Sequence, residues 1–316
     1  MELSNVAALG QSVIDEVEKA VVGKADLLKQ ILVTMLAGGH VLLEDYPGLA
    51  KTLTANSFAI ALGLEFKRIQ FTPDLLPGDI TGSYIHDRNS GQFELRKGPI
   101  FANIILADEI NRASPKTQSA LLEAMQEGQV TLEGETMALP DPFIVIATQN
   151  PIEYEGTFPL PEAQLDRFLV KLSIGYPSAD AEQAVLRGRR ERQKDAFSLQ
   201  PVTDANTLLA MRDAMEQIHV EDDLERYIVK LVRQTRQDSR IAVGASPRGS
   251  LALLKLARAQ AALEGRNYIL PDDVKSYAKA ALSHRMILTP ELWLKQGMSD
   301  QILDAIVQTV PVPVLN

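Results

Sequence analysis

Residues 40–54 read H-V-L-L-E-D-Y-P-G-L-A-K-T-L-T. The apolar run Val41–Leu43 predicts a buried strand, Pro47 and Gly48 end it in a loop, and the apolar spacing after Lys51 predicts a helix. A loop that leads into a helix N-terminus presents backbone N–H groups to an anion, and the helix dipole favours the same charge. We therefore expect a nucleotide's phosphates to be bound by Asp45, Tyr46, Pro47, Gly48, Leu49, Ala50, Lys51, Thr52 and Leu53.

Within this loop, the Lys51 ammonium is expected to reach the β- and γ-phosphates and the Thr52 hydroxyl to coordinate Mg²⁺. Asp45 and Ala50 stand where the pattern G-x-x-x-x-G-K-[ST] has glycine. Alanine is a small change as long as the backbone there keeps a negative φ. A carboxylate beside three phosphates is unfavourable, so replacing Asp45 by glycine is predicted to tighten nucleotide binding. The alternative for the whole stretch is an ordinary strand-to-helix turn with an exposed lysine.

Length and composition limit the possible classes of protein. A chain of 316 residues can form two domains, and it has no cysteine for disulfides or thiolate metal sites. The four histidines are scattered without ligand spacing, so no zinc site is expected. There is neither a signal-peptide pattern nor an apolar run long enough for a membrane span, which predicts a cytoplasmic protein without membrane insertion. The net charge of −9 argues against a chain-wide nucleic-acid surface.

A second strand is predicted at Asn103–Glu109 (N-I-I-L-A-D-E), where a buried apolar run ends in two adjacent carboxylates. Unpaired buried charge is costly, and successive strand residues point to opposite faces. We expect Asp108 to hold Mg²⁺ and Glu109 to polarise the attacking water. The alternative is a strand end capped by solvated acids.

A third buried strand is predicted at Phe143–Thr148, and it ends close to Asn150. An amide there can position water near the γ-phosphate, or it can serve only the turn at Pro151. Arg167 precedes a further strand, Leu169–Ile174, and its alternative role is an ion pair with Asp166. Strands alternating with helices predict a parallel, doubly wound αβα core with its ligand at the carboxyl ends of the strands.

Other segments of the first half are less regular. A helical segment from Val13 to about Leu36 is interrupted at Val22 and Gly23, which lie either against a nucleotide base or in a plain turn. Residues 83–95, with a turn at 87–91, and residues 128–141 predict two hairpins, whereas residues 71–82 are too rich in Pro, Gly and Asp for one regular element.

Residues 175–178 (G-Y-P-S) mark a boundary, so we predict an αβα core over 1–176 and an all-helical second domain over 177–316. Residues 179–193 are expected to form a charged helix with a solvated face, and apolar spacing predicts further helices at 207–218, 224–235, 250–263 and 272–282. Ser246 is a natural N-cap with Pro247 at the first helical position, which puts Arg248 in the first turn. A cation there opposes the helix dipole, which points to an anionic ligand.

Taken in order, Lys51-Thr52, Asp108-Glu109, Asn150, Arg167 and Arg248 form a set that resembles the AAA+ ATPases. The narrower resemblance is to the MoxR family, on the strings F-T-P-D-L-L-P-G-D, L-A-D-E-I-N-R, A-L-L-E-A-M-Q-E, A-T-Q-N-P, L-P-E-A-Q-L-D-R-F and G-A-S-P-R, and it covers nearly the whole chain. The resemblance implies an AAA+ core with insert hairpins, a helical lid, ATP and Mg²⁺. It makes Ala50 usual for the family, while Asp45 departs from the usual glycine.

The resemblance also assigns roles. Asp108 and Glu109 match the Walker B pair, Asn150 matches sensor 1, and Arg248 matches sensor 2. Arg167 matches the arginine finger, which acts on a neighbouring subunit's nucleotide.

It further implies a homo-oligomeric, hexameric ring that acts as a chaperone on a protein client. The client classes implied are proteins with a von Willebrand factor A domain and metal-cofactor enzymes. Two alternatives remain open, which are a motor acting on nucleic acid and a scaffold that binds nucleotide and barely hydrolyses it.

Overall fold

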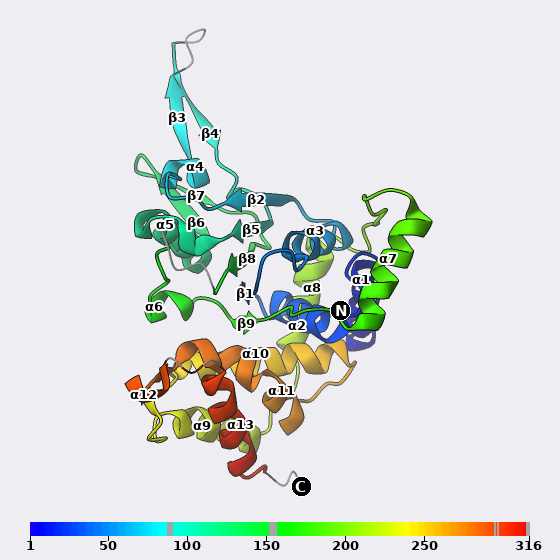
Figure 1. Ribbon diagram of the computed structural model, residues 1–316, viewed down its shortest axis with the longest axis vertical. Helices are drawn as coiled ribbons and strands as arrows, with labels where there is room; N and C mark the ends of the chain where they lie inside the picture. Colours follow the sequence, from blue (N-terminus) through cyan, green and yellow to red (C-terminus); the bar gives the residue numbers. More distant parts are fainter. Residues whose placement is uncertain (87–90, 152–156, 294, 296, 314–316) are drawn as a thin grey trace.

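A computed structural model describes residues 1–86, 91–151, 157–293, 295 and 297–313 (Figure 1). Its centre is a five-stranded parallel sheet in the order β2-β5-β8-β1-β9. The strands are β1 (Val41–Glu44), β2 (Phe66–Gln70), β5 (Ile104–Asp108), β8 (Ile144–Gln149) and β9 (Val170–Leu172). The parallel αβα core predicted from the sequence is confirmed.

Alternating side chains of the central strands face two separate hydrophobic clusters. In β1, Val41 and Leu43 join one cluster, while Leu42 joins the other. The same alternation separates Ile104 from Ile105 in β5. These strands are apolar on both faces because helices cover both sides of a parallel sheet.

The helices of the first half divide between those faces. Residues of α1 (Leu3–Glu18), α2 (Ala25–Leu36) and α3 (Lys51–Ala61) pack into the cluster that contains Val41. The opposite face is covered by α4 (Pro77–Thr81) and α5 (Pro115–Glu127).

Two hairpins extend from the core, as the sequence predicts. They are β3–β4 (Gly82–His86 and Phe93–Lys97) and β6–β7 (Gln129–Leu132 and Glu135–Ala138), and the first projects furthest in Figure 1. The turn predicted at 87–91 falls mostly on residues 87–90, outside the described residues. The irregular stretch 71–82 does contain one short helix, α4, which begins with Pro77 at its first position.

The second half is helical, as predicted, and adds one small sheet. Its helices are α7 (Ala179–Arg192), α8 (Ala205–Met215), α9 (Asp222–Thr235), α10 (Pro247–Leu263), α11 (Pro271–Leu282), α12 (Pro290–Trp293) and α13 (Met298–Thr309). The last two helices and the antiparallel pair β10–β11 (Ile241–Val243 and Ile287–Leu288) were not predicted from the sequence. Strands of two and three residues are too short to show an alternating pattern. Short elements elsewhere are η1 (Ile110–Arg112), α6 (Glu162–Leu165) and η2 (Ser283–Arg285).

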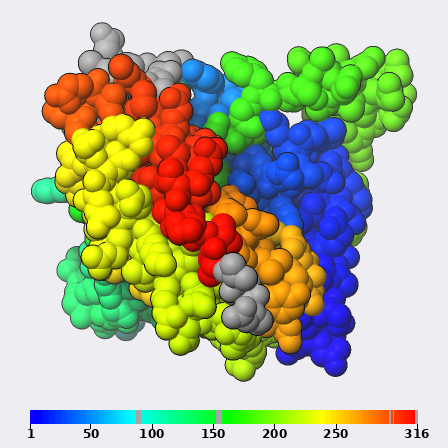
Figure 2. Space-filling view, turned by 90° about the horizontal axis from the view of Figure 1, so that it is seen from below, coloured from blue at the N-terminus to red at the C-terminus, as the bar shows by residue number. Residues whose placement is uncertain are grey.

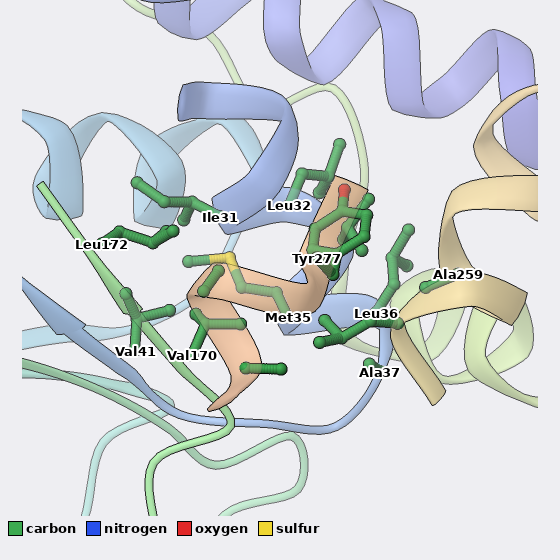
Figure 3. Close-up of a cluster of buried hydrophobic side chains, with 14 of the residues drawn as sticks. Ile31, Leu32, Met35, Leu36, Ala37, Val41, Val170, Leu172, Ala259 and Tyr277 are labelled. Carbon is green, nitrogen blue, oxygen red and sulfur yellow. The ribbon is translucent and has the colours of Figure 1, made fainter. Parts of the chain in front are cut away.

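The core of the sheet continues into the C-terminal helices through α2. Figure 3 shows Met35 of α2 between Val170 of β9 and Tyr277 of α11. On the outside, Figure 2 shows the orange part of the C-terminal helices lying against the blue N-terminal helices, whereas the yellow part lies away from them. No helix in the described part of the chain is long and apolar enough to cross a membrane.

Buried His40, at the start of β1, predicts a pH dependence of stability. Its Nδ1 accepts from the Val145 N–H at 3.0 Å, and its Nε2 lies 3.1 Å from the Met125 carbonyl oxygen. Burial lowers the pKa of His40 to about 4. The unfolded chain therefore takes up this proton near pH 6.5 and the folded chain only near pH 4.

His40 thus contributes stability that is complete above about pH 6.5 and is lost as the pH falls towards 4. We expect the free energy of unfolding to fall by about 3 kcal/mol over that range on account of this residue. Urea unfolding at several pH values should show a shallower pH dependence for His40→Gln. Substituting exposed His219 by glutamine is the matched control. An unchanged slope in His40→Gln would contradict the prediction.

Candidate nucleotide-binding and hydrolysis site

The loop 45–50 joins the carboxyl end of β1 to the N-terminus of α3, as the sequence predicts. Helix α3 begins at Lys51, so Lys51, Thr52 and Leu53 form its first turn. Buried Leu49 anchors the loop, while Tyr46, Pro47 and Gly48 are exposed. The Lys51 Nζ donates to the Asp45 carbonyl oxygen at 2.8 Å, which curls the loop around its own lysine.

Gly48 and Ala50 both have positive φ, of 82° and 56°. The condition under which Ala50 is a small change, a negative φ, is therefore not met. A residue with a Cβ in the left-handed region costs roughly 1–2 kcal/mol. The loop holds this strain directly before the first N–H groups of α3, where a phosphate is predicted to bind.

Ala50→Gly should relieve that strain. Glycine also makes the unfolded chain more flexible, so we expect a net gain in unfolding free energy of about 0.5–1 kcal/mol. Urea unfolding measures it. The control is Ala184→Gly inside α7, which should lose about 1 kcal/mol. A loss of similar size in Ala50→Gly would show that the loop stores no strain at this position.

The Asp45 carboxylate faces the segment after β9. It is buried, and it accepts from the Ser173 hydroxyl at 2.9 Å, from the Gly175 N–H at 3.2 Å and from the Ile174 N–H. The side chain thus turns away from the phosphate side of the loop. The prediction that Asp45→Gly binds nucleotide more tightly assumed a carboxylate beside the phosphates, which the structure does not show. Because glycine would lose the contacts of the carboxylate, we now expect weaker nucleotide binding in this variant.

Asp108 ends β5, two strands in the sheet order from the loop 45–50, which we call the phosphate loop after its predicted role. Its Oδ1 accepts from the Thr148 hydroxyl at 2.6 Å, and its Oδ2 accepts from Arg68 Nη2 at 2.6 Å and Nε at 3.0 Å. Only 9% of the residue is exposed, so hydrogen bonds and an ion pair compensate a largely buried charge.

Glu109 lies just beyond the strand, with φ of 57°. The expectation that it alternates with Asp108 as a strand residue is therefore wrong. Its N–H donates to the Thr148 hydroxyl at 2.8 Å, and its Oε2 accepts from Gln70 at 3.0 Å and Arg112 at 3.1 Å. A left-handed residue held by three groups is locally strained and fixed in place.

Asn150 follows β8, the strand between β5 and β1. The pairing of Glu44 with Gln149 brings the start of the phosphate loop beside Asn150, and the Asp45 N–H donates to the Gln149 carbonyl oxygen at 3.1 Å. Asn150 is 4% exposed. The parallel sheet thus gathers the phosphate loop, the two carboxylates and this amide at one edge.

Val22 and Gly23 lie in the turn between α1 and α2. Gly23 has φ of 73°, and a Cβ there would come within 2.6 Å of the Ala181 Cβ of α7. The turn therefore packs against α7, a contact that the sequence did not predict. The choice between a contact with a nucleotide base and a plain turn stays a prediction.

Thr52 and Asp108 offer a hydroxyl and a carboxylate, which are the hard oxygen donors that Mg²⁺ prefers. Residues 1–86, 91–151, 157–293, 295 and 297–313 contain no group of three or more His, Cys, Asp or Glu that could hold a metal. That donor set fits Mg²⁺, which is usually held by one or two carboxylates, water and substrate phosphates rather than by a protein cage.

Arg167 lies on the opposite side of the sheet, at the amino ends of its parallel strands, which we call the amino edge. Val170 pairs with Val41, and the Leu169 N–H donates to the His40 carbonyl oxygen, so Arg167 precedes the amino end of β9. Strand β1 separates that edge from the phosphate loop by roughly 13 Å, at about 3.3 Å per residue. The Arg167 Nε donates to the Gln126 Oε1 at 3.2 Å.

Arg248 lies at the same edge. The Asp166 carboxylate lies 3.5 Å from Arg248 Nη1 and accepts from Arg285 Nε at 2.7 Å. The alternative role of Arg167, an ion pair with its neighbour, is thus taken by these two arginines. Arg248 sits in the first turn of α10 as predicted, after Ser246 as N-cap.

Arg285 was not predicted from the sequence to belong to the site. Its side chain is 3% exposed and also donates to the carbonyl oxygens of Phe168 at 2.8 Å and Leu169 at 3.0 Å. Burial lowers the pKa of Arg285, and the bond to Asp166 opposes that shift. It fastens the C-terminal helices to the segment that carries Arg167. The sequence signal, one arginine after a helix, is too common to single it out.

Arg68 and Arg112, which hold the carboxylates of Asp108 and Glu109, were also missed. Arg68 could be found only from the strand pairing, which places Gln70 opposite Asp108 and Arg68 on the same face two residues earlier. Arg112 lies three residues after Glu109 in η1.

Comparisons with known proteins agree with this geometry. Residues 40–170 match the family described as ATPases associated with various cellular activities (AAA), and residues 233–306 match the AAA lid domain. A protein of Bacillus subtilis, YeaC, described as uncharacterized, is 50% identical over 306 residues, covering 97% of this chain and 95% of the relative.

The chaperone MoxR1 of Mycobacterium tuberculosis is 42% identical over 312 residues, covering 96% of this chain and 82% of the relative. A crystal structure of a presumed ATPase from Cytophaga hutchinsonii superposes with a TM-score of 0.91 at 42% identity, covering 99% of this chain and 97% of the other. The phosphate loop, the strand-end carboxylates and a fold shared over nearly the full length lead to one assignment. The chain belongs to the MoxR family of AAA+ ATPases.

Proposed function

We propose that this protein hydrolyses ATP with Mg²⁺ as a ring-shaped oligomer and uses the energy to remodel a protein client. The observation that carries the proposal is that the predicted catalytic residues lie in two groups, at the carboxyl ends and at the amino ends of the strands of one sheet. The phosphate loop, Asp108, Glu109 and Asn150 lie at the carboxyl edge, whereas Arg167 and Arg248 lie at the amino edge.

At the carboxyl edge, the loop N–H groups and the Lys51 ammonium bind the phosphates. Lys51 exchanges its bond to the Asp45 carbonyl oxygen for the β/γ-phosphate oxygens. Thr52 and Asp108 hold Mg²⁺, which when bound neutralises developing charge on the phosphates. We assign contact with the base to the turn of Val22 and Gly23.

Hydrolysis forms a bond between a water oxygen and the γ-phosphorus and breaks the bond to the β–γ bridging oxygen. Glu109 polarises that water and takes its proton on the carboxylate, which Arg112 and Gln70 hold in place. Asn150, at the next strand end, orients the water. The products are ADP and inorganic phosphate.

Arg167 and Arg248 cannot serve the phosphate loop of their own chain across the sheet. We assign both to the nucleotide of a neighbouring subunit, where two cations stabilise the charge of the transition state. Asp166 keeps the two arginines near each other, since it pairs with Arg248 and is the residue before Arg167. Closing such head-to-tail contacts generates a ring, and the family resemblance sets the proposed number at six.

The client side is assigned to the two hairpins. Between them lies a groove of about 400 Å³ whose lining includes Tyr84, Glu123 and Glu133. The Tyr84 hydroxyl donates to Glu135 at 2.8 Å. No Lys or Arg lines this groove among the described residues, so it suits a polypeptide better than a phosphate backbone. The proposed client classes are proteins with a von Willebrand factor A domain and metal-cofactor enzymes.

DNA binding measured at several salt concentrations distinguishes a motor that acts on nucleic acid from a chaperone that acts on a protein. A nucleic-acid motor should bind single- or double-stranded DNA with an affinity that falls steeply with salt. The proposal expects no such binding, and pull-downs with an ATP-trapped variant should instead recover a protein. Salt-sensitive DNA binding that stimulates ATP hydrolysis would favour the motor.

Lys51→Met tests the nucleotide site itself. Loss of a charge-assisted contact to the β- and γ-phosphates should weaken ATP binding at least about 100-fold. Calorimetric titration with ATP and Mg²⁺ measures this. The control is Lys67→Met, which removes an exposed lysine paired with Glu65. Parent-like affinity in Lys51→Met would mean that the loop is an ordinary turn.

A further inference from the structure

Residues 173–178, which we call the connector, lead from β9 to α7 and so out of the sheet. Two charged side chains from distant parts of the sequence hold its backbone. The Asp45 carboxylate, from the phosphate loop, accepts from the hydroxyl of Ser173 and from the N–H groups of Ile174 and Gly175. A buried carboxylate is stable only when it is bonded in this way.

Lys24 holds the same residues through their carbonyl groups. Its Nζ donates to the carbonyl oxygens of Ile174 at 2.6 Å, Gly175 at 3.0 Å and Tyr176 at 2.9 Å. An ammonium has three protons, and each of the three carbonyl oxygens can take one. The connector is therefore gripped by an anion on its N–H groups and by a cation on its carbonyl groups.

The main chain of Asp45 belongs to the nucleotide site. Its N–H donates to the carbonyl oxygen of Gln149, the residue before Asn150, at 3.1 Å. Its carbonyl oxygen accepts from the Lys51 Nζ at 2.8 Å. Beside it, Tyr46 stacks on Tyr176 of the connector, with ring centroids 6.3 Å apart. Asp45 thus contacts the predicted phosphate-binding lysine, the last residue of β8, and the connector.

Glycine is not required at position 45, because Asp45 does not have the positive φ that Gly48 and Ala50 have. The aspartate can therefore serve a contact that glycine could not make. A phosphate that draws the Lys51 ammonium away breaks its hydrogen bond to the main-chain carbonyl oxygen of Asp45. The side-chain carboxylate of the same residue holds the connector, so the change can reach it.

We propose that Asp45 is a positioning residue that links the phosphate loop to the connector, so that ATP binding changes the position of α7. Lys24 supplies the opposing grip. This inference rests on the proposed function, since it takes ATP as the ligand of the loop. Asp45 acts through Lys51 and the connector and makes no bond to the reacting atoms.

The test uses pairs of spin labels on the full-length protein. The chain has no cysteine, so cysteines introduced at exposed Ser119 in α5 and exposed Gln183 in α7 are unique attachment sites. Electron–electron double resonance then gives the distribution of distances between the two labels. In the parent, we expect a narrow distribution that shifts when ATP and Mg²⁺ are added.

Asp45→Asn keeps the shape of the side chain but directs an amide N–H₂ at connector groups that are themselves donors. We expect a broader distribution without nucleotide and no shift at saturating ATP. Calorimetry should show that ATP affinity falls by about tenfold or less, because Lys51 remains. A general loss of structure would lower ATP affinity as well, so nearly normal ATP binding without a shift in the distance between the labels would be specific to the loss of the link.

Lys24→Met should broaden the distribution in the same way, although it leaves the loop sequence intact. The matched control is Lys29→Met, which removes a lysine of α2 that pairs with Glu264 at 2.9 Å, and it should behave as the parent. Parent-like widths and shifts in both Asp45→Asn and Lys24→Met would overturn the proposal.

The two levels of the proposal fail separately. If the parent binds no ATP, the proposed function fails, and the distribution without nucleotide still tests the grip on the connector. If the parent binds ATP and the distribution is broad in both variants, yet both still shift with ATP, the grip stands and the link from loop to α7 is refuted.

Discussion

Arg167→Ala is expected to lower ATP turnover by roughly 10³–10⁵-fold while leaving ATP binding nearly unchanged. The arginine lies at the amino edge of the sheet, so its loss should leave the phosphate loop of its own chain intact. What is lost is a cation that stabilises the transition state in a neighbouring subunit. Steady-state ATPase assays at saturating ATP, paired with calorimetric binding, measure both quantities.

The control for this variant is Arg226→Ala in α9, which removes an exposed arginine that pairs with Asp223 at 2.6 Å. It should keep the activity of the parent. If Arg167→Ala also kept that activity, its only role would be the local bond to Gln126, and the assignment as a finger would be wrong.

Glu109→Gln is expected to bind ATP as the parent does and to hydrolyse it about 10²–10⁴-fold more slowly. Glutamine preserves the size of the side chain and an oxygen for Arg112, but it cannot take a proton from water. Single-turnover kinetics should place the loss in the chemical step rather than in binding or release of product.

Glu225→Gln, at an exposed position of α9 in the C-terminal helices, is the matched control and should leave turnover unchanged. If Glu109→Gln hydrolysed ATP at the parental rate, Glu109 would be a structural acid that holds Arg112 and Gln70.

Much of the fold follows from local pattern. The runs that became β1, β5 and β8 are short, continuous and apolar, as is expected for strands covered on both faces. Turn chemistry around residues 133–134 predicts the β6–β7 hairpin, and apolar spacing such as Leu224, Ile228 and Leu231 predicts α9. These features depend on neighbours within a few residues.

The parts of the site that were not predicted depend on contacts between distant residues. Asp45 meets residues 173–175 only after the sheet has formed, so its charge was expected beside the phosphates. Arg285 reaches Asp166 across the sequence from η2. The positive φ of Ala50 is set by how the loop closes on Lys51, which residue type alone does not specify.

The spatial order of strands was likewise beyond local pattern. Only the order β2-β5-β8-β1-β9, and the pairing of β9 with β1, show that Arg167 and the phosphate loop lie at opposite edges. Because of that separation, we assign Arg167 to the nucleotide of a neighbouring subunit rather than to that of its own chain.

A hydrolytic site shared between subunits can be tested directly by mixing two inactive variants. Arg167→Ala keeps Glu109 but lacks the finger, and Glu109→Gln keeps the finger but lacks the base. Exchange of subunits can be followed with fluorophores on cysteines introduced into this cysteine-free chain, and several mixing ratios should be assayed. We expect ATPase activity to return in the mixture, because an Arg167→Ala subunit can receive the finger of a Glu109→Gln neighbour. Proven exchange with no recovery of activity at any ratio would contradict it.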